Sequence, residues 1–386
     1  MMMLQELSAP LIHKRGARIA VSALFFLTGL CFASWASRIP DIQQALHMND
    51  AGLGSVLLAL PVGSLISLPV AGVLVSRFGS RQVLIMAAVA YGALLPVLGL
   101  AQAPWELILV LICFGFCGNL ANIAVNTQAV AVEAMYGRSI MASFHGLWSV
   151  AGFTGAAIGT AMSGLNIAPV YHFLLITGIA WTLVLLTMRH IVQQDANLQS
   201  NQPLFVKPDL FLLTLGIIAM CSMICEGTMF DWSGVYFRRV IHVRDGLSGA
   251  GYAAFMSTMA SGRFVADWMI TRLGTRKMLL ISGILTASGL LIAVVFPYFV
   301  SAMFGFMLVG AGVSSVVPLV YSAAGKSKVM SPGMALAAVS TIGYLGFLFG
   351  PPLIGFVAQA TSLAVSFSII AVMGAAIAVM STRIKW

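Results

Sequence analysis

The chain has 386 residues, of which 60% are hydrophobic and only 8% charged, against roughly 25% charged in an ordinary soluble domain. So few charges cannot cover the surface of a soluble protein of this size, and we expect lipid to surround most of it. The formal net charge of +9 does not indicate nucleic-acid binding, because the basic residues are spread over short loops without interleaved aromatic residues.

Twelve apolar segments are long enough to cross about 30 Å of hydrocarbon, which takes about 20 helical residues. The first six are predicted at 17–38, 51–75, 82–101, 105–131, 139–163 and 169–189. The second six are predicted at 209–230, 247–270, 278–299, 301–324, 333–357 and 362–382. A polar stretch separates the sixes, which predicts an N-terminal six-helix bundle at 1–192, a linker at 193–208 and a C-terminal six-helix bundle at 209–386.

A short basic turn occurs twice in the chain. Residues 76–81 read Ser-Arg-Phe-Gly-Ser-Arg, and residues 271–276 read Thr-Arg-Leu-Gly-Thr-Arg. Both copies connect two apolar segments and lie at equivalent places in the two sixes. The repeat therefore predicts two six-helix pseudo-repeats, an organisation common among secondary transporters.

The lysines and arginines are distributed unequally over the predicted loops. Most lie at the two chain ends and in loops on the same side of the membrane as those ends. The opposite side carries Arg38, Arg238, Arg239 and Arg244. The positive-inside rule then predicts that both termini are cytoplasmic.

The first basic turn resembles the signature of the major facilitator superfamily. Gly72-x3-Ser76-Arg77-x-Gly79-x-Arg81 matches Gly-x3-Asp-Arg/Lys-x-Gly-x-Arg/Lys, with serine in place of the aspartate. The resemblance implies an all-α membrane protein with the major facilitator superfamily fold and twelve transmembrane helices. It also implies that the arginines of both turns, Arg77, Arg81, Arg272 and Arg276, have a gating role.

Other segments resemble one branch of this superfamily, the YbjJ-type proteins of the bacterial inner membrane, and more distantly the fucose permeases. They are residues 33–40, 145–149, 226–232, 262–264 and 343–352. Fucose permeases are proton-coupled sugar importers with carboxylates in spans one and four. This chain has Ala36 and the Asn119 region at those places, so we expect a different residue to couple proton movement.

Ionisable residues inside the predicted spans call for an explanation, since each costs roughly 2.5–3.5 kcal/mol at the bilayer centre. Glu226 lies about 24 Å along span seven, and Arg38 and Asp231 lie at similar depths near the outer end. We predict that Arg38 and Asp231 form an outer gate. A carboxyl group shielded from water can exchange protons near neutral pH, which makes Glu226 the predicted proton-coupling residue. A purely structural hydrogen-bonding role is the alternative.

Asn119, Asn122 and Asn126 share one face of span four, which must look into the bundle. Amides both donate and accept hydrogen bonds, so we predict substrate binding, with hydrogen bonding between helices as the alternative. Further predicted substrate-binding residues are His145, Trp35, Trp148 and Tyr344. Arg263 and Asp267 are one turn apart and are predicted to pair as part of a gate.

The chain is therefore predicted to be a proton-coupled secondary transporter of a small polar solute, such as a sugar or sugar derivative, in the bacterial inner membrane. One alternative is an exporter of amphiphilic compounds or metabolites on the same fold, and another is a non-transporting membrane sensor. We expect a monomer that is not an enzyme and has no catalytic residues, cofactor or metal site. Apart from the proton, the solute and the bilayer, no partner is predicted.

Overall fold

The structure is a computed structural model that describes residues 14–136, 140–193, 209–324, 327 and 332–384. Within these ranges the chain is helical and has no strand. Every predicted apolar segment lies on a helix in its described part. The predicted linker lies outside the described residues, apart from residue 193.

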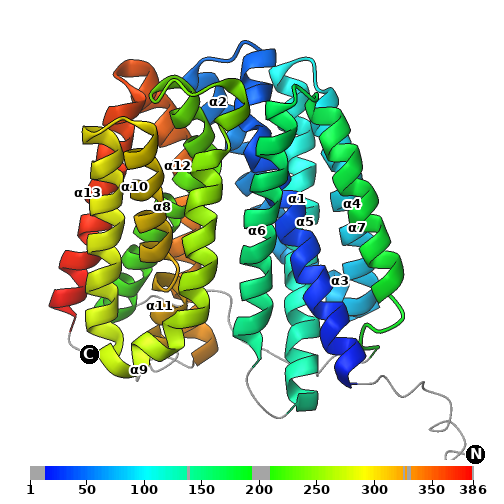
Figure 1. The fold of residues 1–386 in the computed structure, drawn as a ribbon. Coiled ribbons are helices and arrows are strands. Elements are labelled where there is room, and N and C mark those ends of the chain that lie inside the picture. Colours follow the sequence, from blue (N-terminus) through cyan, green and yellow to red (C-terminus); the bar gives the residue numbers. More distant parts are fainter. Residues whose placement is uncertain (1–13, 137–139, 194–208, 325–326, 328–331, 385–386) are drawn as a thin grey trace, which may run out of the picture.

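The first half of the chain forms the helices α1 to α7. Their bounds are α1 Lys14–Ala45, α2 Asp50–Leu57, α3 Ala59–Phe78, α4 Ser80–Leu100, α5 Pro104–Tyr136, α6 Met141–Gly164 and α7 Pro169–Thr187. The second half is α8 Leu210–Arg239, η1 Asp245–Leu247, α9 Ala250–Val295, α10 Phe299–Val313, α11 Val316–Ala324, α12 Pro332–Ala360 and α13 Leu363–Arg383. In α9 the helix reverses direction at Gly274, so it supplies two consecutive arms of the bundle (Figure 1).

Ten stretches of described residues are long and apolar enough to cross a membrane. Large apolar side chains such as Leu185, Leu186 and Val300 are exposed on the outside of the bundle. Water would oppose that exposure, whereas lipid chains do not. The protein is therefore a multi-pass membrane protein.

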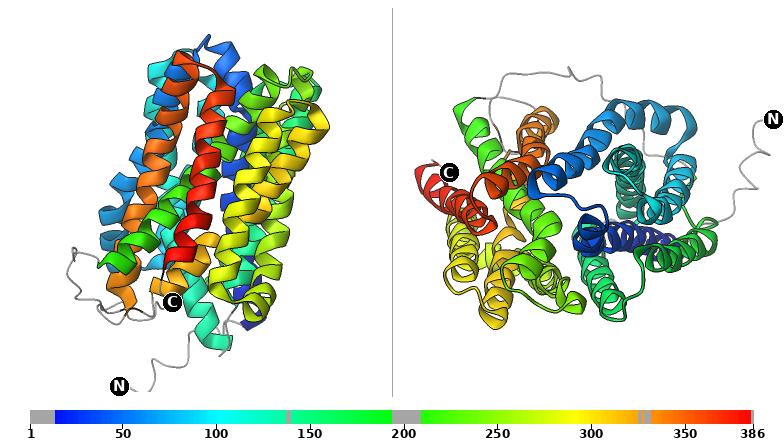
Figure 2. Two further views of the ribbon diagram at one scale, coloured as in Figure 1. Left: turned by 90° about the vertical axis from the view of Figure 1, so that its left-hand side faces the viewer. Right: turned by 90° about the horizontal axis from the view of Figure 1, so that it is seen from above.

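The helices gather into two groups, α1–α7 and α8–α13, which stand side by side (Figures 1 and 2). We call the end where α1 begins and α13 ends the basal end, and the opposite end the apical end. Contacts between the groups join α1 to α8, α2 to α12 and α6 to α9. These contacts place the boundary between the two halves along the middle of the molecule.

The two copies of the basic turn have the same backbone conformation. Gly79 has φ 78° and ψ 149°, and Gly274 has φ 76° and ψ 159°. Residues other than glycine rarely adopt this region, because a side chain would clash with the backbone. The repeat in the sequence is thus also a repeat in the structure.

The last arginine of each turn has the same function in its own half. Arg81 Nη2 donates to the Met188 carbonyl oxygen at 3.0 Å, just after the end of α7. Arg276 Nη2 donates to the Thr382 carbonyl oxygen at 2.7 Å, at the end of α13. Each guanidinium thus supplies a donor to the unpaired carbonyls at the C-terminal end of a helix, where a positive charge is also favourable.

The backbones of the two halves approach closely where α2 meets α12 near the apical end. A Cβ atom at Gly54 would lie 2.8 Å from the Pro351 carbonyl oxygen, and one at Gly355 would lie 2.5 Å from that of Asp50. Both positions require glycine, because any side chain would force the helices apart. The Pro351-Pro352 pair lies within α12 at this contact.

The turn conformation gives a first test. We expect Gly274→Ala to lower the stability of the purified protein by roughly 1–3 kcal/mol, because alanine is strained at this φ although no atom lies within 4 Å of its Cβ position. Gly178→Ala is the matched control, since that Cβ position is equally open and the residue is helical. It should be neutral or stabilising by about 0.5–1 kcal/mol.

The measurement is the apparent melting temperature of each variant in detergent. Equal melting temperatures for the two variants would contradict the assignment of strain to the turn.

Candidate functional site

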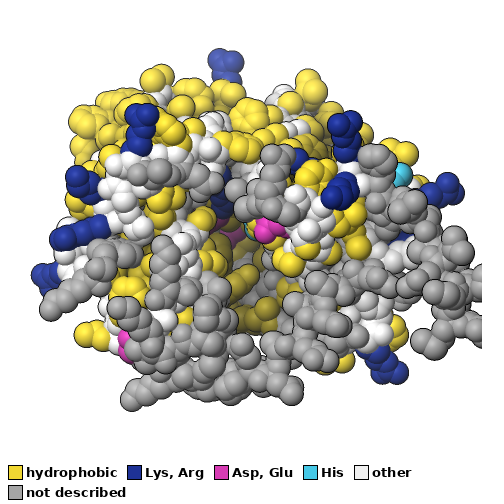
Figure 3. Space-filling view, turned by 90° about the horizontal axis from the view of Figure 1, so that it is seen from below, with side chains coloured by type: hydrophobic (Ala, Val, Ile, Leu, Met, Phe, Trp, Pro, Cys, Tyr) yellow, Lys and Arg dark blue, Asp and Glu magenta, His cyan; other side chains and the backbone are white. Residues whose placement is uncertain are grey.

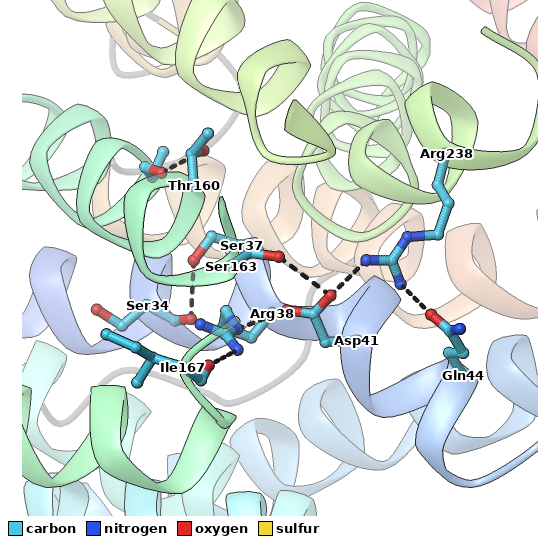
Figure 4. Close-up of polar contacts among 10 residues, drawn as sticks. Ser34, Ser37, Arg38, Asp41, Gln44, Thr160, Ser163, Ile167 and Arg238 are labelled. Atoms are coloured by element: carbon cyan, nitrogen blue, oxygen red, sulfur yellow. Dashed lines mark hydrogen bonds and ion pairs between the residues drawn. The ribbon is translucent and has the colours of Figure 1, made fainter. Parts of the chain in front are cut away.

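A cluster of charged side chains connects the two halves at the apical end (Figure 4). Arg38 Nε lies 2.6 Å from Asp41 Oδ2, one turn away on α1. The other oxygen of Asp41 forms an ion pair with Arg238 of α8. Arg238 also donates to Gln44 Oε1 at 3.2 Å. Asp41 therefore carries the connection from one half to the other.

Arg38 is the most enclosed member of this cluster, with 2% of its side chain exposed. Its Nη2 donates to the Ile167 carbonyl oxygen at 2.5 Å, between α6 and α7. The Ser163 hydroxyl of α6 donates to Asp41 Oδ1 at 3.3 Å. The cluster thus unites α1, α6 and α8 around one carboxylate, and that carboxylate neutralises a buried guanidinium.

A second ion pair joins the halves beside the first. Arg239 of α8 pairs with Asp50 at the start of α2. Gln43 Nε2 lies 3.4 Å from the same Asp50 oxygen. Arg239 is 41% exposed, so water weakens this pair far more than the pair around Asp41.

The structure does not pair Arg38 with Asp231, the predicted gate partner, in this conformation: Arg38 pairs with Asp41. Asp231 is half-buried, and among the described residues it has no hydrogen bond or ion pair. It lies seven residues before Arg238, about 10 Å lower along α8, beyond the reach of Arg38. The sequence does contain the missed signal: Asp41 and Asp50 on one half face two consecutive arginines on the other.

The basal end shows a different arrangement. Arg77 lies over the Phe78 ring and Arg272 over the Trp268 ring, while Arg81 and Arg276 bond within their own halves. Within the described ranges no ion pair joins the halves at this end. Figure 3 shows a hollow between them from this side, with acidic side chains in its depth. In the described part of the chain, the ion pairs between the halves thus lie at the apical end and the hollow at the basal end.

A cavity of about 210 Å³ lies between the halves. Most of its lining comes from the first half, and Tyr344 of α12 comes from the second. The lining residues are Thr28, Phe32, Leu60, Ser64, Tyr91, Phe114, Gly115, Gly118, Asn119, Asn122, Trp148 and Tyr344. This lining combines aromatic rings with hydroxyl and amide groups and has no charged side chain.

The three predicted asparagines have different surroundings. Asn119 is buried and donates to the Ser64 carbonyl oxygen at 3.0 Å and to Ser67 Oγ at 2.6 Å. It therefore connects α5 to α3. Asn126 donates to the carbonyl oxygen of Asn122 at 2.8 Å and to its Oδ1 at 3.0 Å. Asn122 is half-buried and lines the cavity, and among the described residues its amide N–H groups make no hydrogen bond.

The predicted aromatic residues and the predicted histidine also lie in different surroundings. Trp148 and Tyr344 line the cavity, but Trp35 does not: it is 1% exposed and belongs to the core. Trp35 lies almost one turn beyond Phe32, where the closed apical end covers α1. His145 is exposed on α6, and its ring lies 5.2 Å from that of Phe25, outside the cavity lining.

Glu226 and Arg263 meet next to the cavity. Glu226 is 7% exposed on α8, and its Oε1 lies 3.5 Å from Arg263 Nη2 on α9. Arg263 Nη1 donates to Ser149 Oγ on α6 at 2.7 Å. The guanidinium also lies 5.8 Å from the centre of the Trp148 ring. This group therefore bridges the two halves beside a cavity-lining side chain.

The predicted partner of Arg263 was Asp267, whose side chain lies outside the described residues. The structure instead pairs Arg263 with the carboxylate of a neighbouring helix. A buried carboxylate on α8 needs a nearby positive charge, and Arg263 is the one that the packing of α9 brings to it.

An assembly of membrane-spanning helices in two repeated halves, joined by ion pairs at one end and enclosing a cavity, is the architecture of a membrane transporter. The sequence comparisons agree. The Major Facilitator Superfamily model matches residues 21–327 and 242–385. An MFS-type transporter of Yersinia pestis is 35% identical over 356 residues, which cover 92% of each chain. The protein belongs to the Major Facilitator Superfamily.

Two further similarities are more limited. The enterobactin exporter EntS of Escherichia coli is 28% identical over 184 residues, which cover 45% of this chain and 44% of EntS. The crystal structure of the nucleoside transporter NupG has a TM-score of 0.74 at 14% identity, covering 95% of this chain and 98% of NupG. The second similarity shows a shared fold.

The ion pairs at the apical end give a second test. We expect Asp41→Asn to destabilise the protein by roughly 3–5 kcal/mol, because buried Arg38 loses its counter-charge. Asp50→Asn removes a pair whose arginine is exposed and should cost less than about 1 kcal/mol. The two variants make the same chemical change in neighbouring pairs, so each controls for the other. Their apparent melting temperatures in detergent give the comparison, and a larger loss for Asp50→Asn would contradict it.

Proposed function

We propose that this protein is a secondary active transporter of the bacterial inner membrane, with twelve membrane-spanning helices, which moves a small polar solute by proton-coupled alternating access. One observation carries the proposal. A cavity lined by aromatic rings with hydroxyl and amide groups lies between two halves that ion pairs hold together at the apical end, while the described residues of the basal end form no such pairs. That is the geometry of one of the two states between which an alternating-access carrier moves.

The basic residues support an orientation for this state. Lys14, Arg77, Arg272 and Arg383 lie at the basal end, and the positive-inside rule assigns such a surface to the cytoplasm. In our proposal both termini are cytoplasmic and the state is inward-facing. Opening towards the outside then requires the Asp41–Arg238 and Asp50–Arg239 pairs to break.

The cavity favours a small solute with hydrogen-bonding groups. Its volume of about 210 Å³ is below the roughly 300–1,000 Å³ of common drug-sized ligand pockets. Asn122, Ser64 and Thr28 offer amide and hydroxyl groups, while Tyr91 and Trp148 offer ring faces. A sugar or sugar derivative suits this combination, as does a nucleoside of the kind that NupG carries. The likeness to the YbjJ-type branch and to fucose permeases stays a prediction.

An exporter on the same fold is the second candidate. The partial similarity to EntS, an exporter by name, favours it. The small cavity argues against a bulky amphiphile as its cargo and leaves export of a compact metabolite as the form to test.

Glu226 is the residue that we propose for proton coupling. It is buried within the bundle, and the open basal end gives a route from water towards the cavity beside it. Its pairing with Arg263 spans α8 and α9, and Arg263 also contacts α6 of the other half. A change in the charge of this carboxylate therefore alters a contact between the halves, which is what coupling requires.

The transport proposal predicts uptake of at least one solute from a panel of sugars, sugar derivatives and nucleosides into proteoliposomes. The uptake should occur when the outside is made more acidic than the inside, so that protons flow inward. Glu226→Gln should abolish accumulation driven by the gradient but keep exchange of labelled solute across the membrane, because the permanently neutral side chain cannot carry a proton. Glu106→Gln is the control, since Glu106 caps the start of α5 through the Gln102 N–H at 2.8 Å. Unchanged gradient-driven accumulation by Glu226→Gln would exclude the coupling role.

The asparagines give a separate test in the same assay. Asn122→Ala should raise the KM for solute roughly 10-fold at nearly normal stability, because it removes a cavity-lining amide. Asn119→Ala should instead lower the melting temperature, because it removes the two hydrogen bonds that join α5 to Ser64 and Ser67 of α3, with KM unchanged in the folded protein. The reverse pattern would show that the two residues have been assigned to the wrong functions.

A further inference from the structure

Arg263 occupies a place where the two halves and the cavity meet. Its guanidinium is held by the Ser149 hydroxyl of the other half at 2.7 Å and lies over the ring of Trp148, which lines the cavity. The side chain is 20% exposed and lies on the first arm of α9, in a predicted membrane span. A cation in such a position is costly and calls for a functional explanation.

The contact between Arg263 and Glu226 is loose. The 3.5 Å separation of Nη2 and Oε1 exceeds the roughly 2.7–2.9 Å of a charge-assisted hydrogen bond. Arginine has five N–H donors in a planar fork that matches a carboxylate through two parallel bonds. Glu226 makes a single long contact, so the guanidinium is neutralised without being fully bonded. A second carboxylate could bind it better than Glu226 does.

We propose that the solute carries a carboxylate, which takes the place of Glu226 on Arg263 while the polar body of the solute lies in the cavity towards Asn122. This inference rests on the proposed transport function and names the chemical class of its solute. Trp148 and Tyr344 line the same cavity as Asn122, and Trp148 also contacts Arg263.

Charge balance couples this binding to one proton. With Glu226 ionised, the Glu226–Arg263 pair is neutral, and an anion entering beside it would leave a net negative charge in a low-dielectric interior. If a proton from water binds the Glu226 carboxylate first, Arg263 is left with one positive charge, and the anion restores neutrality. One proton and one carboxylate then cross together, and no net charge moves.

Other groups with charge or titratable protons surround this pair. His145 of α6 lies close to Arg263, and Tyr252, Tyr321 and Tyr344 lie close to Glu226. Asp231 is five residues further along α8. In the described part of the chain, Arg263 is the positive charge that acts on Glu226. The exchange of partners therefore centres on these two residues.

The test uses the purified full chain in detergent and two sets of matched solutes. One set is glucuronate, glucose and glucosamine; the other is lactate, propane-1,2-diol and 1-aminopropan-2-ol. Each set contains an acid, a neutral compound and an amine on a similar skeleton. The melting temperature is measured with each solute at about pH 5.5 and about pH 7.5, where a simple carboxylic acid stays ionised.

At least one acid should raise the melting temperature more than its neutral and amine counterparts, and more at the lower pH. In Glu226→Gln the stabilisation by the acid should persist and lose its pH dependence. In Arg263→Gln the acid should bind roughly 10- to 100-fold more weakly. Arg244→Gln, which alters an exposed arginine of the apical loop, should behave like the wild-type protein.

Arg263→Gln could fail to fold because Glu226 loses its partner. In that case the double variant Arg263→Gln/Glu226→Gln, which removes both charges, is used in the binding test instead of the single variant. The inference is overturned if neither acid stabilises the protein, if a neutral compound or amine stabilises it as well as the acid, or if the acid binds unchanged without Arg263. Proton-driven uptake of a neutral solute in proteoliposomes would overturn this inference and leave the proposed transport function intact.

Discussion

The observed conformation depends on the two ion pairs of the Asp41 carboxylate. The carboxylate neutralises Arg38, which is almost fully buried on the same helix, and it binds Arg238 on the other half of the molecule. Neither arginine could lie there without a counter-charge, since an unpaired cation in a low-dielectric environment is strongly unfavourable. The close contact of α2 with α12 at Gly54 and Gly355 complements these ion pairs through packing alone.

The two ends of the bundle use their charges differently. At the apical end, opposite charges on the two halves attract each other. At the basal end, Arg81 and Arg276 bind carbonyl oxygens within their own halves and stiffen the two turns. The equivalent hydrogen bond in each half helps to hold that half together as a rigid body. Carriers of this architecture expose their site to one side of the membrane or the other by moving two such rigid bodies relative to each other.

The middle of the molecule connects these ends. Arg263 contacts Ser149 across the boundary and Glu226 within its own half, so its surroundings depend on both halves. Asn119 contributes to the cavity mainly by fixing α5 against α3, which holds Asn122 in place at the cavity wall. The amides on this helix face thus have different surroundings, one buried between helices and one at the cavity wall.

The sequence by itself determined the helices, the repeat and the superfamily, because apolar length and a glycine at a positive φ are local properties that need no neighbour. It also singled out Glu226 and Arg263 as charges that lipid would exclude. Only the tertiary structure decided which charges meet across the bundle: Asp41 binds Arg238 of the other half, and Arg263 binds Glu226 on another helix. Helical spacing gives the depth and face of a side chain, but the packing of helices far apart in the chain decides which groups it meets, and for the same reason Trp35 is enclosed in the core while Trp148 lines the cavity.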